Sequence, residues 1–321
     1  MTALLDMKVF NTQLQTAIIK KLTQKTDLFT TASGIALINE AMMGDFKEEA
    51  IWNNVSDALR DVDANAAQAT VTATGLSQDQ INDVKTMKAF GPITWEPNQL
   101  SWIGKNPGEA LSVISESLSM AVMQDQVNKA IGVLVAAISN QAGAFLDVSA
   151  DAGVLGAVSQ INLNKSHALF SDASQNLTTQ IMFGTTAHKL IGQALDNGDV
   201  LFREGTVRVI DILGKRTVIT DSPALTAGAK ERVLTLQPMA ATIASNNDFR
   251  SSIVEGTGKT RLETTYQAEY TENVSVKGYS WNTAVKSPVK AQLETGTNWT
   301  LIMPLKESAG VLLIGDPAKG E

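Results

Sequence analysis

The chain has 321 residues, a formal net charge of −7 and no cysteine. The absence of cysteine excludes disulfides, thiolate nucleophiles and zinc sites of the Cys type. The acidic balance argues against a sequence-reading DNA-binding protein, because neutralisation of phosphates by basic residues supplies most of the affinity of such proteins. With 44% hydrophobic and 18% charged residues, the composition is typical of a globular chain with one large or two modest domains.

The first 60 residues are predicted to be mainly helical. Apolar residues recur at helical spacing from Val9 to Leu22, which indicates an amphipathic helix and not a signal peptide. Packing of this helix against protein is favoured over binding at a membrane surface, and no apolar run is long enough to predict a membrane span. Two more helices are predicted near residues 32–43 and 46–59. The six acids between residues 45 and 63 are interpreted as a solvated face.

Residues 61–95 are rich in small and polar side chains. Residues 69–73 alternate as in a strand, and Gly91-Pro92 predicts a turn. A segment of this length with little to pack is typical of a functional loop or of an arm. In an oligomer a neighbouring subunit can supply the missing contacts, so the segment points to assembly.

The strongest helix signal covers residues 106–140. Asn106 is a suitable N-cap, Pro107 suits the first helical position, and Glu109 stands three residues after the cap. Apolar residues then follow one stripe from Leu111 to Ile138. At 1.5 Å per residue the helix would be about 50 Å long, which predicts an architectural spine.

The remainder of the chain predicts a mixed α+β protein. Residues 146–260 indicate an α/β region with helices near 166–176 and 187–194 and strands near 180–183, 203–213, 215–220, 229–234 and 239–244. Gly214 marks the turn between two of these strands. Residues 261–321 alternate polar and apolar side chains and predict further strands.

Two blocks of the sequence carry a resemblance. The first lies in residues 162–221 and contains Ser171-Asp172-Ala173, Ile181-Met182 with Gly184, and Leu213-Gly214-Lys215-Arg216. The second contains Lys277-Gly278-Tyr279-Ser280-Trp281, followed by Asn298-Trp299 and the run Val311-Leu312-Leu313-Ile314. In order and spacing both blocks resemble the major capsid proteins of tailed bacteriophages. Met182-Phe183-Gly184 departs from the family, whose members often have Met-His-Ser there.

The resemblance implies the α+β fold of the Hong Kong 97-type capsid proteins. It would assign residues 1–60 to an N-terminal helical arm and 61–95 to an extended loop. Residues 96–145, with the spine helix, and 261–321 would form the peripheral domain, and 146–260 the axial domain. Lys85 and Lys88 on the loop and Trp95 at its end are candidate contacts with a neighbouring subunit.

The resemblance also implies a function without catalysis, cofactor or metal. The chain would self-assemble through pentamers and hexamers into an icosahedral shell that encloses double-stranded DNA without sequence-specific binding. Assembly would take place in the host cytoplasm, with scaffold, portal and decoration proteins as further candidate partners, and the mature location would be the virion capsid. An encapsulin-like bacterial nanocompartment shell protein, which shares this fold, stays open as an alternative.

A nucleotide-dependent enzyme is the third hypothesis, and it rests on Gly258-Lys259-Thr260. A phosphate-binding loop needs a glycine five positions before the Gly-Lys pair, where this chain has Ile253, and a helix after it, where this chain predicts a strand. His167 and His188 have no carboxylate at a metal-ligand spacing. A core position is predicted for each of the five tryptophans, Trp52, Trp95, Trp102, Trp281 and Trp299.

Overall fold

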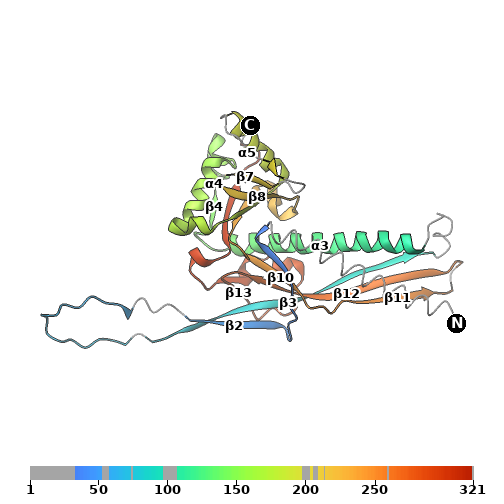
Figure 1. The fold of residues 1–321 in the computed structure, drawn as a ribbon, viewed down its shortest axis with the longest axis horizontal. Coiled ribbons are helices and arrows are strands. Elements are labelled where there is room, and N and C mark those ends of the chain that lie inside the picture. Colours follow the sequence, from blue (N-terminus) through green and yellow to red (C-terminus); the bar gives the residue numbers. More distant parts are fainter. Residues whose placement is uncertain are drawn as a thin grey trace.

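Two β-sheets and one long helix organise the chain. The computed structural model describes residues 33–52, 58–73, 75–96, 107–196, 203–204, 209–212, 214–258 and 260–319. Figure 1 shows an elongated base, from one end of which a hairpin projects, and a second module that rises from the middle of the base. The helix predicted near residues 9–22 lies outside the described residues.

The base is an eight-stranded sheet in which β12 is the central strand. The sheet follows the order β1-β10-β12-β13-β14, and β3 and β11 also pair with β12 while β2 pairs with β3. Its strands are β1 (Ile35–Asn39), β2 (Phe46–Trp52), β3 (Gln78–Trp95), β10 (Ala241–Ser245), β11 (Arg250–Gly256), β12 (Glu263–Val276), β13 (Tyr279–Trp281) and β14 (Trp299–Leu301). Burial largely alternates along β12, which confirms the one-sided strand that the sequence predicts.

The rising module contains a seven-stranded mixed sheet in the order β4-β15-β9-β5-β8-β7-β6. Its strands are β4 (Phe145–Asp147), β5 (Thr179–Met182), β6 (Arg203–Glu204), β7 (Val209–Ile212), β8 (Lys215–Ile219), β9 (Glu231–Leu236) and β15 (Gly310–Gly315). Helices α4 (Gln160–His167) and α5 (Gly184–Asp196) belong to this module (Figure 1). The predicted β5, the helix after it and the β7–β8 hairpin at Gly214 are confirmed.

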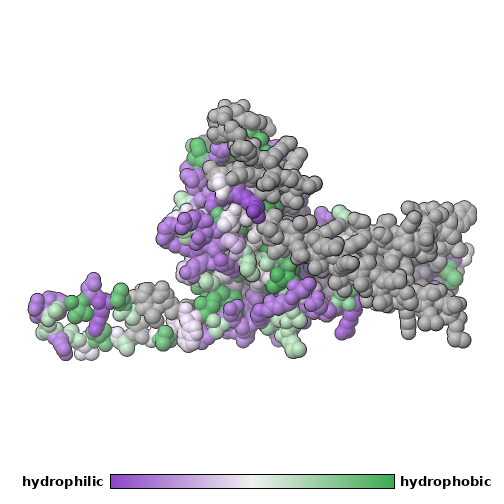
Figure 2. Space-filling view, viewed as in Figure 1, coloured by the Kyte–Doolittle hydropathy of each residue, from purple (hydrophilic) through white to green (hydrophobic). Residues whose placement is uncertain are grey.

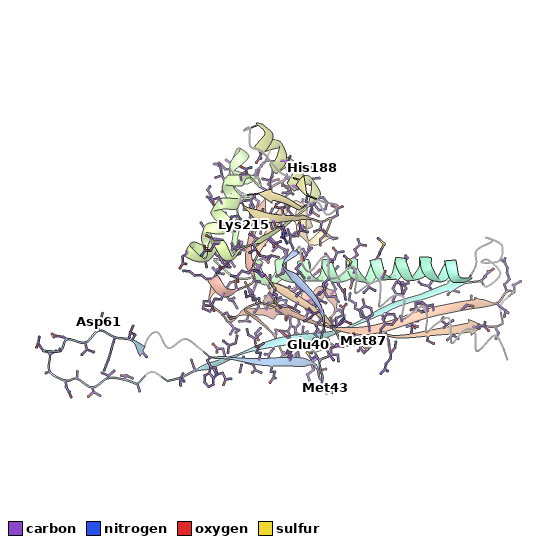
Figure 3. The ribbon with its side chains drawn as sticks, viewed as in Figure 1. Glu40, Met43, Asp61, Met87, His188 and Lys215 are labelled. Carbon is purple, nitrogen blue, oxygen red and sulfur yellow. The ribbon has the colours of Figure 1, made fainter. Side chains whose placement is uncertain are left out.

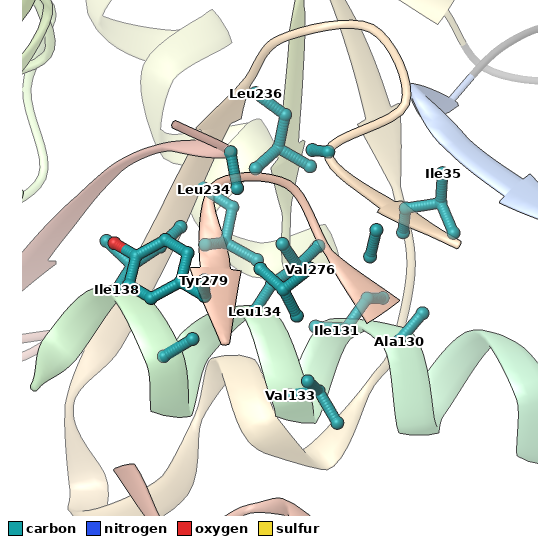
Figure 4. Close-up of a cluster of buried hydrophobic side chains, with 14 of the residues drawn as sticks. Ile35, Ala130, Ile131, Val133, Leu134, Ile138, Leu234, Leu236, Val276 and Tyr279 are labelled. Atoms are coloured by element: carbon teal, nitrogen blue, oxygen red, sulfur yellow. The ribbon is translucent and has the colours of Figure 1, made fainter. Parts of the chain in front are cut away.

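Helix α3 (Pro107–Ser139) has 33 residues and confirms the spine helix predicted over residues 106–140. Its predicted N-cap, Asn106, lies outside the described part of the chain. Its C-terminal half buries Ile131, Leu134 and Ile138 completely. These side chains share one core with Leu234 and Leu236 of the seven-stranded sheet and with strand β12 of the base (Figure 4). Helix α3 therefore joins the two sheets through a common apolar core. No helix within the described ranges is long and apolar enough to cross a membrane.

The two helices predicted near residues 32–43 and 46–59 are wrong. Residues 35–39 form β1, which runs parallel to β10 with Ile35 opposite Ala241. Residues 46–52 form β2, antiparallel to β3. In each case pairing with a distant segment overrides a local pattern that also fits a helix. The strand predicted from the alternation at residues 69–73 is wrong, and these residues have no regular secondary structure.

A short helix predicted over residues 166–176 is present in broken form. Helix α4 ends at His167, and a 3₁₀ segment, η3 (Ala168–Asn176), follows it. Ser171 interrupts η3 with φ of 49° and ψ of −122°. The described residues also contain six shorter helical segments. They are η2 (Gly153–Gly156), η4 (Pro223–Leu225), η5 (Ala227–Ala229), α6 (Lys290–Leu293), η6 (Gly296–Asn298) and η7 (Leu305–Glu307).

The turn predicted at Gly91-Pro92 is wrong as well, since both residues lie inside β3. The register of β3 against β12 shifts there, between Tyr266 and Ala268. Gly91 has φ of +96°, and a Cβ atom would lie 2.7 Å from the carbonyl oxygen of Tyr266. Glycine is therefore required by both the backbone conformation and the close strand approach.

We expect Gly91→Ala to lower the free energy of unfolding by about 1–3 kcal/mol, because the alanine meets a backbone atom at a strained φ. Urea denaturation of the unassembled subunit would measure it. Gly75→Ala is the matched control, since nothing lies within 4 Å of a Cβ atom at that position. Equal stability of both variants would contradict the close packing of β3 on β12.

The predicted core position is confirmed for two tryptophans and wrong for a third. Trp281 and Trp299 are buried, with ring centroids 4.8 Å apart in an edge-on arrangement. Trp52 is 65% exposed at the end of β2. Trp102 and the side chain of Trp95 lie outside the described part of the structure.

Candidate subunit interfaces

The hairpin formed by β2, β3 and the residues between them projects away from the base (Figure 1). The ladder between the two strands runs from Phe46 opposite Val84 to Trp52 opposite Gln78. Beyond it, every described residue between 58 and 77 is exposed. Asp63 takes part in a short-range hydrogen bond there, which runs from the Ala66 amide to its carbonyl oxygen at 3.2 Å. The described residues of the tip thus leave their side chains largely open to solvent.

Large apolar side chains are exposed along this hairpin. They are Trp52 at 65%, Leu59 at 89%, Val62 at 72%, Val71 at 52% and Leu76 at 73%. Figure 2 shows hydrophobic residues interspersed with hydrophilic ones along the projecting segment. Single exposed apolar residues are ordinary, but five on one narrow projection indicate a surface that another protein covers.

The root of the hairpin, where β1, β2 and β3 meet, is firmly attached. The Met42 amide donates to Oδ1 of Asn246 at 2.8 Å, and Nζ of Lys85 donates to the Met42 carbonyl oxygen at 3.1 Å. The Asn82 amide donates to Oγ of Ser280 at 3.1 Å. Two of these bonds join the hairpin and the residues that lead into it to positions 198 and 204 residues away in the sequence, so the root is held by the body of the chain.

The three predicted contact residues lie at the sheet and not on the projecting part. Lys85 and Lys88 stand opposite Asn273 and Tyr270 of β12, and Trp95 stands opposite Thr264. Residues 84–95 of the expected loop are therefore part of the eight-stranded sheet. Both lysines have partners within the chain, and Nζ of Lys88 lies 2.8 Å from a carboxylate oxygen of Asp125. Contact of these three residues with a neighbouring subunit stays a prediction.

A buried ion pair connects α3 to β12 beside Lys88. Lys129 and Glu272 form a salt bridge, and both side chains are fully buried. Nε2 of Gln126 also donates to Oε1 of Glu272 at 2.7 Å. Burial lowers the pKa of Lys129, an effect that the carboxylate of Glu272 opposes. No sequence signal marks this pair, because its members stand 143 positions apart.

A second charged cluster at the root was also missed from the sequence. Lys47 of β2 stands opposite Asp83 of β3, and its Nζ lies 2.6 Å from Oε1 of Glu40. Glu49 follows Lys47 on the same face of β2. Burial raises the pKa of Asp83 to about 6, against the lowering effect of Lys47 and with the added repulsion of Glu49 and Glu40.

Further exposed apolar side chains occur on the base. Met43 is 97% exposed and Met87 55% exposed, and Figure 3 places both beside the root of the hairpin, near Glu40. Val254 and Leu262 are 59% and 61% exposed near the opposite end of the base, where β11 turns into β12. The molecule therefore presents uncovered apolar side chains at both ends, as an assembling subunit would.

The geometry does not support nucleotide binding at Gly258 and Thr260. The residues between β11 and β12 connect two antiparallel strands, and Lys259 lies outside the described residues. Because β12 follows the turn, no helix N-terminus is present there to bind a phosphate. The hypothesis of a nucleotide-dependent enzyme therefore lacks the helix that a phosphate-binding loop needs after the Gly-Lys-Thr sequence.

The two histidines do not form a metal site. His167 is buried, with its Nε2 atom 3.2 Å from Nε2 of Gln180 and 3.3 Å from Oγ1 of Thr235. Burial, with a smaller contribution from the Lys215 ammonium group, lowers the pKa of His167 to about 4. His188 is exposed on α5. Among the described residues no group of three histidine or carboxylate side chains is arranged to hold a metal ion.

Comparisons with solved structures show the expected fold. A capsid structure of the Helicobacter pylori bacteriophage KHP30 matches with 12% identity and a TM-score of 0.53, covering 89% of this chain and 87% of that one. A chain of Mycobacterium phage Adephagia matches with 10% identity and a TM-score of 0.52, covering 89% of each. The capsid of cyanophage Pam1 matches with 11% identity and a TM-score of 0.51, covering 88% of this chain and 89% of that one.

A sequence family accounts for nearly the whole chain. The Gp13-like family, described as major capsid protein 13-like, matches residues 6–312. No curated protein matches the chain by sequence. The family match covers the projecting hairpin, the spine helix and both sheets. The chain therefore belongs to the Gp13-like family of major capsid proteins, and it is a structural subunit of an icosahedral phage capsid.

Proposed function

We propose that the projecting hairpin holds the shell together by lying on a neighbouring copy of the chain. The observation that carries this proposal is the set of five exposed apolar side chains on a projecting hairpin whose described residues from 58 to 77 are all exposed. Burial of apolar surface is the main favourable contribution to protein association. Each contact contributes modestly, and repetition around closed symmetry makes the shell stable.

The proposal extends to the organisation of the shell. Copies of the chain would form pentamers and hexamers that share one fold, with the hairpin adapting to both. In this proposal the rising module, formed by most of residues 145–236 together with β15, is the axial domain, and the spine helix with the long strands is the peripheral domain. The shell would form in the host cytoplasm with scaffold, portal and decoration proteins as partners.

The proposed content of the shell is double-stranded DNA, held without sequence-specific contacts. The net charge of −7 supports this part of the proposal, because an acidic subunit encloses a polyanion without binding it tightly. The subunit would act as a container without catalytic activity.

Replacing apolar tip residues by serine tests the docking of the hairpin. We expect the triple variant Leu59→Ser, Val62→Ser, Leu76→Ser to fold with an unchanged melting temperature, because these side chains contact little within the chain. Its yield of shells should fall at least about 10-fold, since loss of about 1 kcal/mol per side chain recurs in every subunit. Negative-stain electron microscopy and sedimentation velocity would measure the yield.

The matched control keeps the tip apolar through Leu59→Met, Val62→Ile and Leu76→Met, and it should assemble like the wild type. Normal shells from the serine variant would contradict hairpin docking. Loss of shells from both variants would also count against it, because an apolar contact tolerates such conservative changes.

A further inference from the structure

The joint at which the hairpin leaves the base contains more acids than bases. The ammonium group of Lys47 interacts electrostatically with three carboxylates, those of Glu40, Glu49 and Asp83. Nζ of Lys47 is bonded to Oε1 of Glu40 at 2.6 Å, while Asp83 stands opposite Lys47 across the β2–β3 ladder. The cluster thus carries excess negative charge where two strands must stay paired.

The position of this cluster links its charge to the attachment of the hairpin. The Glu40 amide donates to the Ser245 carbonyl oxygen at 3.1 Å, and the Glu40 carbonyl oxygen accepts from Nδ2 of Asn273 at 3.2 Å. Glu40 is therefore fixed to the base by its backbone and joined to β2 through Lys47. Asp83 precedes Val84, the last residue of the hairpin ladder, which is completely buried.

We propose that the Glu40, Lys47, Glu49 and Asp83 cluster is a proton-sensitive joint, in which proton uptake by Asp83 tightens the pairing of β2 with β3. The part of the proposal that concerns shells, namely that the joint sets how rigidly the hairpin meets a neighbouring copy, rests on the proposed function. When Asp83 is ionised, it repels Glu49 and Glu40 and competes with Glu40 for Lys47. When it is protonated, the repulsion ends and Lys47 stays with Glu40.

The surrounding elements offer Asp83 no second counter-ion. The charged groups that act on it are Lys47 and Glu49 on β2 and Glu40 after β1. Strand β13 (Tyr279–Trp281), which contacts β3, carries neither a carboxylate nor an ammonium group, and it bonds to the neighbouring Asn82 amide through a hydroxyl. Lys85, two residues along β3, donates its Nζ to the Met42 carbonyl oxygen at 3.1 Å, so Lys47 is the ammonium group that acts on Asp83 and a proton can relieve the remaining charge.

The direction of the pH dependence follows from the pKa of Asp83. The ordinary value is 3.8 and the folded value is about 6, so the closed joint binds the proton more tightly than an opened one. The joint therefore gains stability as the pH falls through 6 and loses it as the pH rises through 6. This is opposite to the usual behaviour of a salt-bridged aspartate.

Hydrogen–deuterium exchange on the full chain tests the joint. Peptides that cover residues 46–52 and 78–84 would be followed at pH 5.0 and pH 7.5, with β15 as internal reference and correction for the intrinsic pH dependence of exchange. We expect about 3-fold to 10-fold greater protection at pH 5.0 in the wild type, because pH 5.0 lies about one unit below the folded pKa of about 6 and solvent screens the cluster.

Asp83→Asn should remove this pH dependence and show at pH 7.5 the protection that the wild type reaches at pH 5.0. Asp63→Asn, at the exposed tip, is the matched control and should behave like the wild type. Lys47→Met leaves Asp83 without its counter-ion and should move the transition to higher pH, so the test does not depend on one variant.

Equal protection of the wild type at both pH values would overturn the proposal, as would an undiminished pH dependence in Asp83→Asn. These results are separate from hairpin docking, which the serine variant of the tip tests by shell yield. A subunit that assembles through its tip but shows no pH-dependent joint would leave the proposed function intact.

Discussion

Replacing Lys129 by methionine should lower the free energy of unfolding by about 3–5 kcal/mol. The change leaves the fully buried carboxyl group of Glu272 without its ammonium partner, while Gln126 remains as a donor. An uncompensated buried charge is among the most destabilising results of a single substitution. Urea denaturation of the unassembled subunit, followed by tryptophan fluorescence, would measure the loss.

Two controls separate burial from charge. Lys290→Met removes a lysine whose side chain is 44% exposed and lies 3.7 Å from Glu294, and it should cost less than about 0.5 kcal/mol. The double variant Lys129→Met, Glu272→Leu should recover most of the loss, because the buried charge is gone. If Lys129→Met were no worse than Lys290→Met, the buried pair between α3 and β12 would be incorrect.

Trp299→Ala should lower the free energy of unfolding by about 3–5 kcal/mol. The Trp299 side chain is 1% exposed and meets the ring of Trp281 edge-on. Its Nε1 atom also donates to the Leu293 carbonyl oxygen at 2.9 Å. The substitution therefore opens a cavity beneath α3 and leaves a buried carbonyl group without a donor. Thermal and urea unfolding would both report the change.

Trp52→Ala is the matched control, because the same side chain is deleted from a position that is 65% exposed. The free energy of unfolding of this variant should stay within about 0.5 kcal/mol of the wild type. Trp299→Phe keeps an aromatic ring but loses the Nε1 donor, and it should fall between the two alanine variants. Equal losses for Trp52→Ala and Trp299→Ala would contradict the burial of the tryptophan pair.

Local patterns predicted the elements whose side chains repeat regularly. Helix α3 extends over about nine turns, and burial alternates along most of β12. Gly214 has φ of +70° at the turn of the predicted β7–β8 hairpin. In such elements the neighbours along the chain and the tertiary contacts favour the same conformation, so the pattern is a sufficient guide.

The base of the hairpin could not be predicted, because its structure depends on contacts far along the chain. The apolar run of β1 becomes a strand only through β10, about 200 residues later. Strand β2 has a pattern that fits a solvated helix, and its pairing with β3 decides otherwise. The pairing of Lys129 with Glu272 and the crowding of acids around Lys47 arise only once the sheet has formed.

The placement of the predicted contact residues could not be obtained from local sequence either. Lys85 and Lys88 were assigned to a loop because their segment offers few apolar side chains to pack. They lie instead in the half of β3 that β12 covers, and they bond to Met42 and Asp125. Composition indicated that part of this region extends from the body. It could not indicate where the extended part ends and the sheet begins.

Strand β3 runs from the hairpin to the opposite end of the base, over 18 residues or about 60 Å, with one register shift beside Gly91. The hydrogen bonds between β3 and β12 lie across the strand direction. A force along the axis of the hairpin therefore acts on many of these hydrogen bonds in shear, all at the same time. Peeling, by contrast, would break the bonds one after another. A subunit built in this way resists tension along the hairpin better than the strength of its individual bonds suggests.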